Sequence, residues 1–321
     1  WKRVTGVQTC ALPIFSASGL AGLTTGQMAG LSAAQLGALA SDQMQSLSED
    51  QLRGLTTAQL AALDTADLNQ FTQSQFQALS TAQIANLTNN QVASLESADL
   101  AALSANQVAA LRTGQIAAMD SGDVAALTGE QLAAFTTAQV RALETDDIDN
   151  LALGAFGSFS SAQIAALSTA QLGALSSDQV QSLSNEQLSG LTTVQLAALD
   201  TADLNLLTDS QFQSLSTAQI AGLTTRQVAQ LDAADLAALS ATQVAAFRTA
   251  QIAGMDAADI GVLTGEQVAA LSSTQLRAIE TNDFGSMSVS AVGSLSAAQI
   301  AVLTTAQLGA MASDQLQALS E

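Results

Sequence analysis

Large apolar residues recur every eight positions from Phe15 to Ala318, which gives 38 consecutive octads without an insertion or a deletion. Position 1 of each octad is Leu, Phe, Met or Ile, and position 6 is always apolar. Position 5 is Gln in 27 copies and Asp in eight, whereas positions 7 and 8 are mostly Ala or another small residue. Such regularity predicts that each octad is one structural unit packed on its neighbours.

The polar positions predict the start of a helix in every octad. Position 2 is Ser, Thr, Asp or Glu in most copies, and together with the polar residue at position 5 it matches the capping box, in which two side chains bond reciprocally to the backbone. In the octad 55–62, Thr56 is the expected N-cap, Gln59 the third helical residue, and residues 57–62 the helix. The abundant Ala, Leu and Gln also favour helix.

Three other architectures fit the pattern less well. One continuous helix would need a turn of roughly 4.0 residues, too far from 3.6 for mild supercoiling to absorb. A β-solenoid would need β-branched or aromatic strands with Gly, Asn or Pro at the corners, and helical hairpins would need a period of roughly 33–45 residues. The sequence therefore predicts an all-α fold, a tight α-solenoid (superhelix) with one very short helix per repeat and with positions 1 and 6 buried throughout.

A second, longer period overlies the first, and its length is 17 octads. The segment 62–68 recurs at 198–204, which indicates duplication of a block within a single solenoid array over residues 15–321. Each block has one degenerate octad, 151–158 or 287–294, that carries Ala in place of the polar residue at position 5. Two interpretations stay open for these octads: a seam or bend in the solenoid, or a worn copy.

Residues 1–14 do not follow the repeat. The segment 4–14 resembles an in-frame translation of a sequencing adapter at the edge of an assembled metagenomic contig, and it contains the only Pro and the only Cys. We interpret residues 1–14 as a non-native, disordered leader. Its deletion is expected to change the stability by less than about 0.5 kcal/mol.

Composition excludes several classes of function. A net charge of −20 and a pI near 4.1 argue against binding to nucleic acid or to anionic membrane surfaces. Polar residues interrupt every octad, so no run approaches the roughly 18 apolar residues of a membrane span. Outside residues 1–14 there is no His, Cys or Lys, which leaves only carboxylates and hydroxyls for catalysis. An enzyme is the least expected class, and no catalytic residue is assigned.

The acids follow a rule within the octads: wherever position 5 is Asp, position 2 is also acidic, and no other octad has an acid at position 2. The eight pairs are Asp64 and Asp67, Glu96 and Asp99, Asp120 and Asp123, Glu144 and Asp147, Asp200 and Asp203, Asp232 and Asp235, Asp256 and Asp259, and Glu280 and Asp283.

Two interpretations of the acid pairs are open. Helix N-termini favour negative charge, so the pairs could simply be caps that face solvent. Alternatively, oxygen ligands from successive coils could hold a calcium ion, although the spacing matches neither the EF-hand nor the glycine-rich nonapeptide. The intervals between pairs predict about 3.4 octads per superhelical turn, with the acids in one stripe along the solenoid. Calcium is the one candidate cofactor.

The string Ala-Leu-Ser-Thr-Ala-Gln, at residues 78–83 and 166–171, resembles the octapeptide arrays of large bacterial surface and adhesin-like proteins. The resemblance implies an exported spacer, stalk or fibre, located outside the cell or on its surface, whose partners are neighbouring solenoids or cell-surface components. The alternative is a binding scaffold whose groove holds a peptide or glycan. A scaffold should show a local patch of residues that break the repeat, and the sequence shows none.

Overall fold

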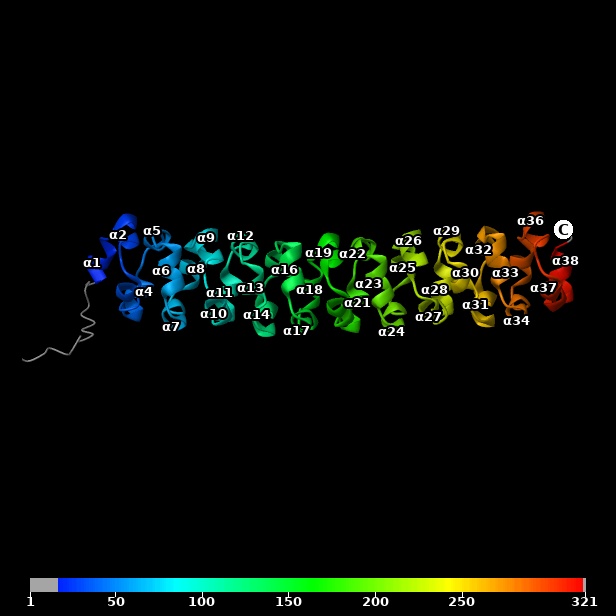
Figure 1. The fold of residues 1–321 in the computed structure, drawn as a ribbon, viewed down its shortest axis with the longest axis horizontal. Coiled ribbons are helices and arrows are strands. Elements are labelled where there is room, and N and C mark those ends of the chain that lie inside the picture. Colours follow the sequence, from blue (N-terminus) through cyan, green and yellow to red (C-terminus); the bar gives the residue numbers. More distant parts are fainter. Residues whose placement is uncertain (1–16, 320–321) are drawn as a thin grey trace, which may run out of the picture. The chain divides into compact units, whose positions relative to one another are not determined.

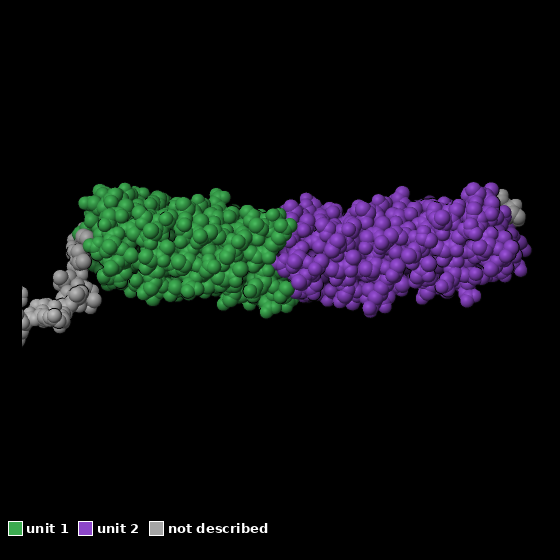
Figure 2. Space-filling view, in the orientation of Figure 1, with its two compact units in different colours: residues 1–158 green, residues 159–321 purple. Residues whose placement is uncertain are grey.

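The computed structural model describes residues 17–319, and these residues form 38 α-helices of four to six residues and no β-strand (Figure 1). The predicted solenoid of very short helices is confirmed. The chain divides into two compact units, residues 1–158 and 159–321 (Figure 2). The prediction of a single array over residues 15–321 stays a prediction, and the interpretation of residues 1–14 lies outside the described residues.

Each octad contributes one helix, numbered in the order of the octads. The helices of the first unit are α1 (Ala17–Ala21), α2 (Thr25–Ala29), α3 (Ala33–Leu36), α4 (Ser41–Gln45), α5 (Glu49–Arg53), α6 (Thr57–Ala62), α7 (Thr65–Leu68), α8 (Gln73–Ala78), α9 (Thr81–Ala85), α10 (Asn89–Ala93), α11 (Ser97–Ala102), α12 (Ala105–Ala109), α13 (Thr113–Ile116), α14 (Ser121–Ala126), α15 (Gly129–Ala133), α16 (Thr137–Ala142), α17 (Thr145–Asp149) and α18 (Leu153–Phe156). Those of the second unit are α19 (Ser161–Ala166), α20 (Thr169–Gly173), α21 (Ser177–Ser182), α22 (Asn185–Gly190), α23 (Thr193–Ala198), α24 (Thr201–Leu204), α25 (Asp209–Ser214), α26 (Thr217–Gly222), α27 (Thr225–Val228), α28 (Ala233–Ala238), α29 (Ala241–Ala245), α30 (Thr249–Ile252), α31 (Ala257–Val262), α32 (Gly265–Ala270), α33 (Ser273–Ala278), α34 (Thr281–Phe284), α35 (Val289–Gly293), α36 (Ala297–Ile300), α37 (Thr305–Ala310) and α38 (Ser313–Ala318).

The chain changes direction between helices through a corner of extended backbone. In the octad that contains α6, Thr56 is the N-cap with φ −73° and ψ 154°, and Leu63, after the helix, has φ −65° and ψ 143°. Within residues 17–319 no residue has a positive φ. Because extended backbone is open to every L-residue, the corners need neither Gly nor Asn. This explains how Leu and Ser or Thr can form a corner every eight residues.

Three octads make one turn of the solenoid. In both units most helices pack on the helix three places further along the chain, so α5 lies between α2 and α8, and α28 lies between α25 and α31 (Figure 1). The prediction of about 3.4 octads per turn is wrong, because the intervals between acid pairs do not follow the period of the coil.

The interior is filled by positions 1 and 6, as predicted. Every position 6 side chain from Leu20 to Val292 and every position 1 side chain from Leu47 to Leu295 is buried. Exposure rises only near the ends of the described chain, for example at Leu23, which is half-buried, and at Leu316, which is exposed. Burial of two large apolar side chains contributes roughly 3–6 kcal/mol per octad. A helix of this length is unstable alone, so the folding of each octad depends on its neighbours.

Small residues at position 8 let consecutive coils approach. A Cβ atom added to Gly54 would lie 2.7 Å from the Cα atom of Thr25, and one added to Gly190 would lie 2.7 Å from the Cβ atom of Ser161. In both cases position 8 of one coil meets position 3 of the preceding coil. The preference for small residues at position 8 is therefore a packing requirement.

The two degenerate octads differ in their surroundings. The octad of α18 is the last one of the first unit, whereas α35 lies inside the second unit and packs between α32 and α38. The loss of the polar residue at position 5 therefore does not by itself mark a boundary between units. Among residues 17–319, no helix is long and apolar enough to cross a membrane.

Candidate functional site

The Gln at position 5 joins each coil to the preceding one. The backbone N–H of Ser80 donates to Oε1 of Gln83 over 2.8 Å, and the N–H of Gln83 donates to the Ser80 hydroxyl over 3.3 Å, which completes the predicted capping box. The amide Nε2 of Gln83 then donates to the carbonyl oxygens of Leu52 and Leu55, both over 2.8 Å. Gln83 is only 3% exposed. One side chain thus caps its own helix and bonds the corner that lies one turn earlier.

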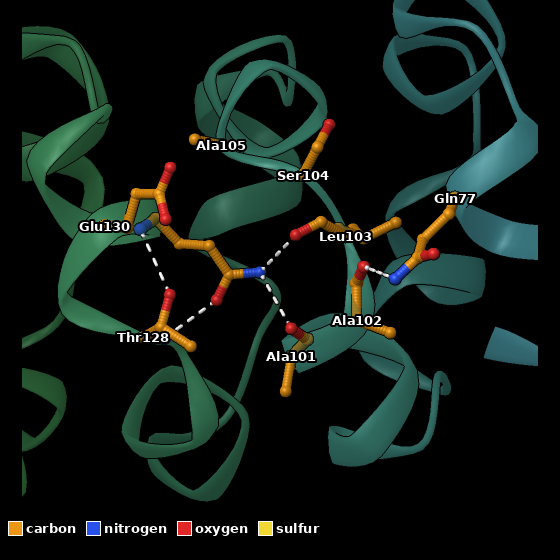
Figure 3. A pocket seen from close by; sticks show the side chains of 9 residues that line it. Gln77, Ala101, Ala102, Leu103, Ser104, Ala105, Thr128 and Glu130 are labelled. Atoms are coloured by element: carbon orange, nitrogen blue, oxygen red, sulfur yellow. Dashed lines mark hydrogen bonds between the residues drawn. The ribbon is translucent and has the colours of Figure 1, made fainter. Parts of the chain in front are cut away.

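This arrangement repeats along both units. Nε2 bonds a carbonyl oxygen at a sequence separation of 28, and in most copies also one at a separation of 30 or 31. Figure 3 shows one copy, in which Nε2 of Gln131 donates to the carbonyl oxygens of Leu103, over 2.7 Å, and of Ala101, over 3.3 Å. Gln77 makes a further contact between coils, because its Nε2 donates to the carbonyl oxygen of Ala102 over 3.0 Å. We call the contact that the Gln at position 5 makes, from the start of its helix to the corner one turn earlier, the seam.

The sequence predicted the cap but not the seam. Capping is a contact over three residues, whereas the seam joins residues a whole turn apart and depends on the length of that turn. One signal for the seam was present: no octad has Glu at position 5, although Glu serves as well as Gln in a capping box. Only the amide has a hydrogen to donate to the carbonyl oxygens.

Replacement of a seam Gln by Leu is expected to destabilise the fold by about 2–4 kcal/mol, because it leaves buried backbone groups without partners. Gln219 is suitable, since its Nε2 donates to Leu188 and Leu191 over 2.8 and 2.9 Å. Urea denaturation would measure the loss. As the control, Gln213→Leu removes an exposed Gln, with one bond to Ala238, and should cost less than about 1 kcal/mol. Equal losses would contradict this role of the seam.

In each acid pair, one carboxylate faces solvent and the other lies at the seam. The acid at position 2 is exposed in all eight pairs, whereas the Asp at position 5 is buried or half-buried. In four pairs the exposed acid also caps its helix, as where Oδ1 of Asp120 accepts from the N–H of Asp123 over 2.9 Å. The side chain of Asp has no amide hydrogen, so these eight seams lack the bridge that Gln makes elsewhere.

Burial raises the pKa of every Asp at position 5, and the neighbouring acid at position 2 adds to the effect. The largest shift is that of Asp235, where burial, Asp232 and Asp209 together raise the pKa to about 6. Charge also acts between coils: Asp120 raises the pKa of Asp147.

The acid pairs do not form one stripe. In the first unit, the pairs on α11, α14 and α17 lie on consecutive coils, whereas α7 packs on α10, in another column of helices. In the second unit, the pairs on α28, α31 and α34 are stacked, and α24 packs on α21 and α27. The single stripe predicted from the sequence is wrong, because with three octads per turn only pairs three octads apart share a column. We call the two stacks of three pairs the acid ladders.

No group of three or more Asp, Glu, His or Cys side chains suited to hold a metal ion occurs in the part of the chain that the structure describes. The assignment of calcium to all sixteen acids stays a prediction. Hollows of about 260–500 Å³ recur along the seams and are lined by Ala, Thr and Gln together with charged side chains such as Asp200, Arg277 and Glu280. The polar groups of the seam bond mainly to other groups of the chain, so the arrangement serves cohesion.

The repeated helix, corner and seam define a tandem-repeat protein of the α-solenoid class. The chain belongs to the ALTTAQ repeat family, whose model matches residues 92–129, 116–153, 154–185, 196–233, 228–265, 242–273, 276–313 and 292–321. A search of curated proteins finds no match to this sequence.

Proposed function

We propose that this chain is a non-enzymatic structural segment, a spacer, stalk or fibre, of a large bacterial surface or secreted protein. The observation that carries the proposal is the seam, because a buried Gln joins coil to coil in most octads of each unit. A fold held together only by neighbouring coils grows by adding repeats, and each added coil extends the array.

The chemistry of the seam supports a structural role. The buried polar side chains use their hydrogen-bonding groups to cap helices and to bond corners, as Gln107 does with Phe76 and Leu79. Substrate binding would need polar groups that converge on a pocket. The exposed positions are mostly Ala, Ser, Thr and acids, and a net charge of −20 opposes non-specific aggregation.

Export rests on the resemblance of Ala-Leu-Ser-Thr-Ala-Gln to the arrays of surface proteins. Neighbouring solenoids and cell-surface components are the partners that such a segment would contact. The sequence of the gene beyond both ends of this chain tests export directly. A secretion signal together with an anchor or secretion domain would support the proposal, whereas flanking enzyme domains would favour the runner-up, a binding scaffold.

A spacer should change its length in steps when whole coils are removed. Deletion of residues 79–102 removes one coil of three octads, and deletion of residues 79–126 removes two. Small-angle X-ray scattering should show the longest dimension of the particle fall by about 9 Å per coil, the usual distance between packed helices. A dimension that does not depend on the number of coils would contradict the spacer.

A further inference from the structure

Two buried side-chain oxygen atoms without a hydrogen-bond partner occur where the corner after α24 meets the start of α28. Oδ2 of Asp235 and Oδ1 of Asn205 are both buried and have no hydrogen-bond partner. Oδ1 of Asp232 lies 3.3 Å from Nδ2 of Asn205, which also donates to the carbonyl oxygen of Gln230 over 2.8 Å. Buried polar atoms without partners are rare in native proteins, because each one costs free energy.

The register of the seam shows what is missing at Asp235. In the next octad, Nε2 of Gln243 donates to the carbonyl oxygens of Phe212 and Leu215, both over 2.8 Å. The same register, with sequence separations of 31 and 28, assigns the carbonyl oxygens of Leu204 and Leu207 to Asp235. The side chain of Asp is shorter by one methylene group and, when ionised, carries only acceptors. By this register the carboxylate of Asp235 faces carbonyl oxygens at a seam where an ordinary octad has the amide nitrogen of Gln.

We propose that Asn205, Asp232 and Asp235 bind a calcium ion, which joins the corner after α24 to the start of α28. All the donor atoms are oxygens, which suit a hard cation rather than zinc. Asp232 is exposed and leaves room for water ligands. Calcium accepts six to eight oxygen ligands in irregular geometry, whereas magnesium demands a near-ideal octahedron. The ion would take the place of the amide group as the positive partner of the carbonyl oxygens.

The proposed site gives a reason for the acid pair at the start of α28. Two carboxylates three residues apart repel each other, and at this seam Asp209 adds a third negative charge that raises the pKa of Asp235. A bound divalent cation turns this repulsion into attraction. Asp232 makes no side-chain capping hydrogen bond to its own helix, so a cation in place of Gln would give this carboxylate a role.

A second copy of the arrangement lies one block of 17 octads earlier. Oδ1 of Asn69 is likewise buried without a partner, and its Nδ2 donates to the carbonyl oxygen of Ser94 over 2.7 Å. Glu96 and Asp99 follow at the matching seam, and Gln73 stands where the second unit has Asp209. With one carboxylate fewer nearby, this copy should bind calcium more weakly than the site at Asp235.

Hydrogen exchange measured by mass spectrometry tests the site locally, at about pH 7.5 and with calcium or magnesium chloride at equal concentration. Calcium at about ten times its dissociation constant should slow exchange at the start of α28 and at the corner after α24 by about tenfold. Magnesium should have a much smaller effect. The variant Asp232→Ser/Asp235→Gln has the residues of an ordinary octad, so it should fold and lose the calcium response.

The matched control is Asp178→Ser/Glu186→Gln, which removes the same charge from two exposed acids and should respond to calcium as the unaltered chain does. Asn205→Ala should weaken the response without changing the charge. The proposal is overturned if calcium leaves exchange unchanged, if magnesium acts equally, or if Asp232→Ser/Asp235→Gln still responds.

Discussion

Acidification from about pH 7.5 to about pH 5 is expected to raise the free energy of unfolding by at least about 1 kcal/mol, in a buffer that contains a chelator. The reason is that all eight Asp residues at position 5 have pKa values raised by burial. Asp235 contributes most, with a pKa of about 6. Of its neighbours, Asp232 and Asp209 act on it directly, and Asp256 and Asp259 lie at the start of α31, which packs on α28.

The direction of the effect follows from the raised pKa values. Between about pH 6 and the ordinary Asp value of 3.8, the folded chain binds more protons than the unfolded chain. The free energy of unfolding therefore rises as the pH falls through this window, and the gain is lost as the pH rises above the folded pKa. A protonated Asp can also donate a hydrogen bond to the corner, as Gln does.

Urea denaturation at both pH values measures this effect. Asp235→Gln should raise stability at about pH 7.5 by about 1–2 kcal/mol, because the amide can bond the carbonyl oxygens of Leu204 and Leu207. The same variant should reduce the dependence on pH. Asp178→Gln, at an exposed position, should change neither quantity appreciably. A chain that becomes less stable on acidification to about pH 5 would contradict the importance of the buried carboxyl groups.

Removal of four residues is expected to cost at least about 5 kcal/mol, whereas removal of a whole octad should cost far less. Deletion of residues 79–86 leaves caps, apolar anchors and seam Gln residues in the same relative order. Deletion of residues 81–84 places caps where apolar anchors belong in the following coil, so several seams lose their partners at once. Both deletions remove Gln83 and Ile84, so these losses are matched.

Thermal unfolding followed by circular dichroism compares the two deletions. The chain without residues 79–86 should keep its helical signal and melt a few degrees lower, as expected for a loss of about 1 kcal/mol. The chain without residues 81–84 should lose cooperativity or helical signal at the temperature where the other is folded. Equal tolerance of both deletions would show that the octad is not the structural unit.

The candidate site was only partly visible in the sequence. The association of acids at positions 2 and 5 was plain, and so was their place at a helix start. The role of Asn205 was not, because a single Asn between two Leu residues carries no periodic signal. Only the fold brings Asn205 to Asp232, a whole turn further along the chain, and shows that Oδ2 of Asp235 is buried without a partner.

Local contacts explain why the sequence by itself determined the octad. The reciprocal bonds of Thr56 and Gln59 span three residues, and the alternation of apolar anchors and caps leaves one way to divide the chain into short helices. These interactions depend only on residues that are close in the sequence, so the octad pattern can be predicted from the sequence alone.

The tertiary structure alone decided how many octads close a turn and which side chains meet across it. The corners at residues such as Leu63 are extended backbone without a turn signature, so their angle cannot be read from residue types. The turn of three octads brings the amide of a seam Gln to its acceptors, as Gln83 reaches Leu52 and Leu55, and lets the small residues of position 8 pack on the preceding coil. The number of octads in a turn decides which acid pairs stack into the acid ladders, because pairs share a column only when they lie three octads apart.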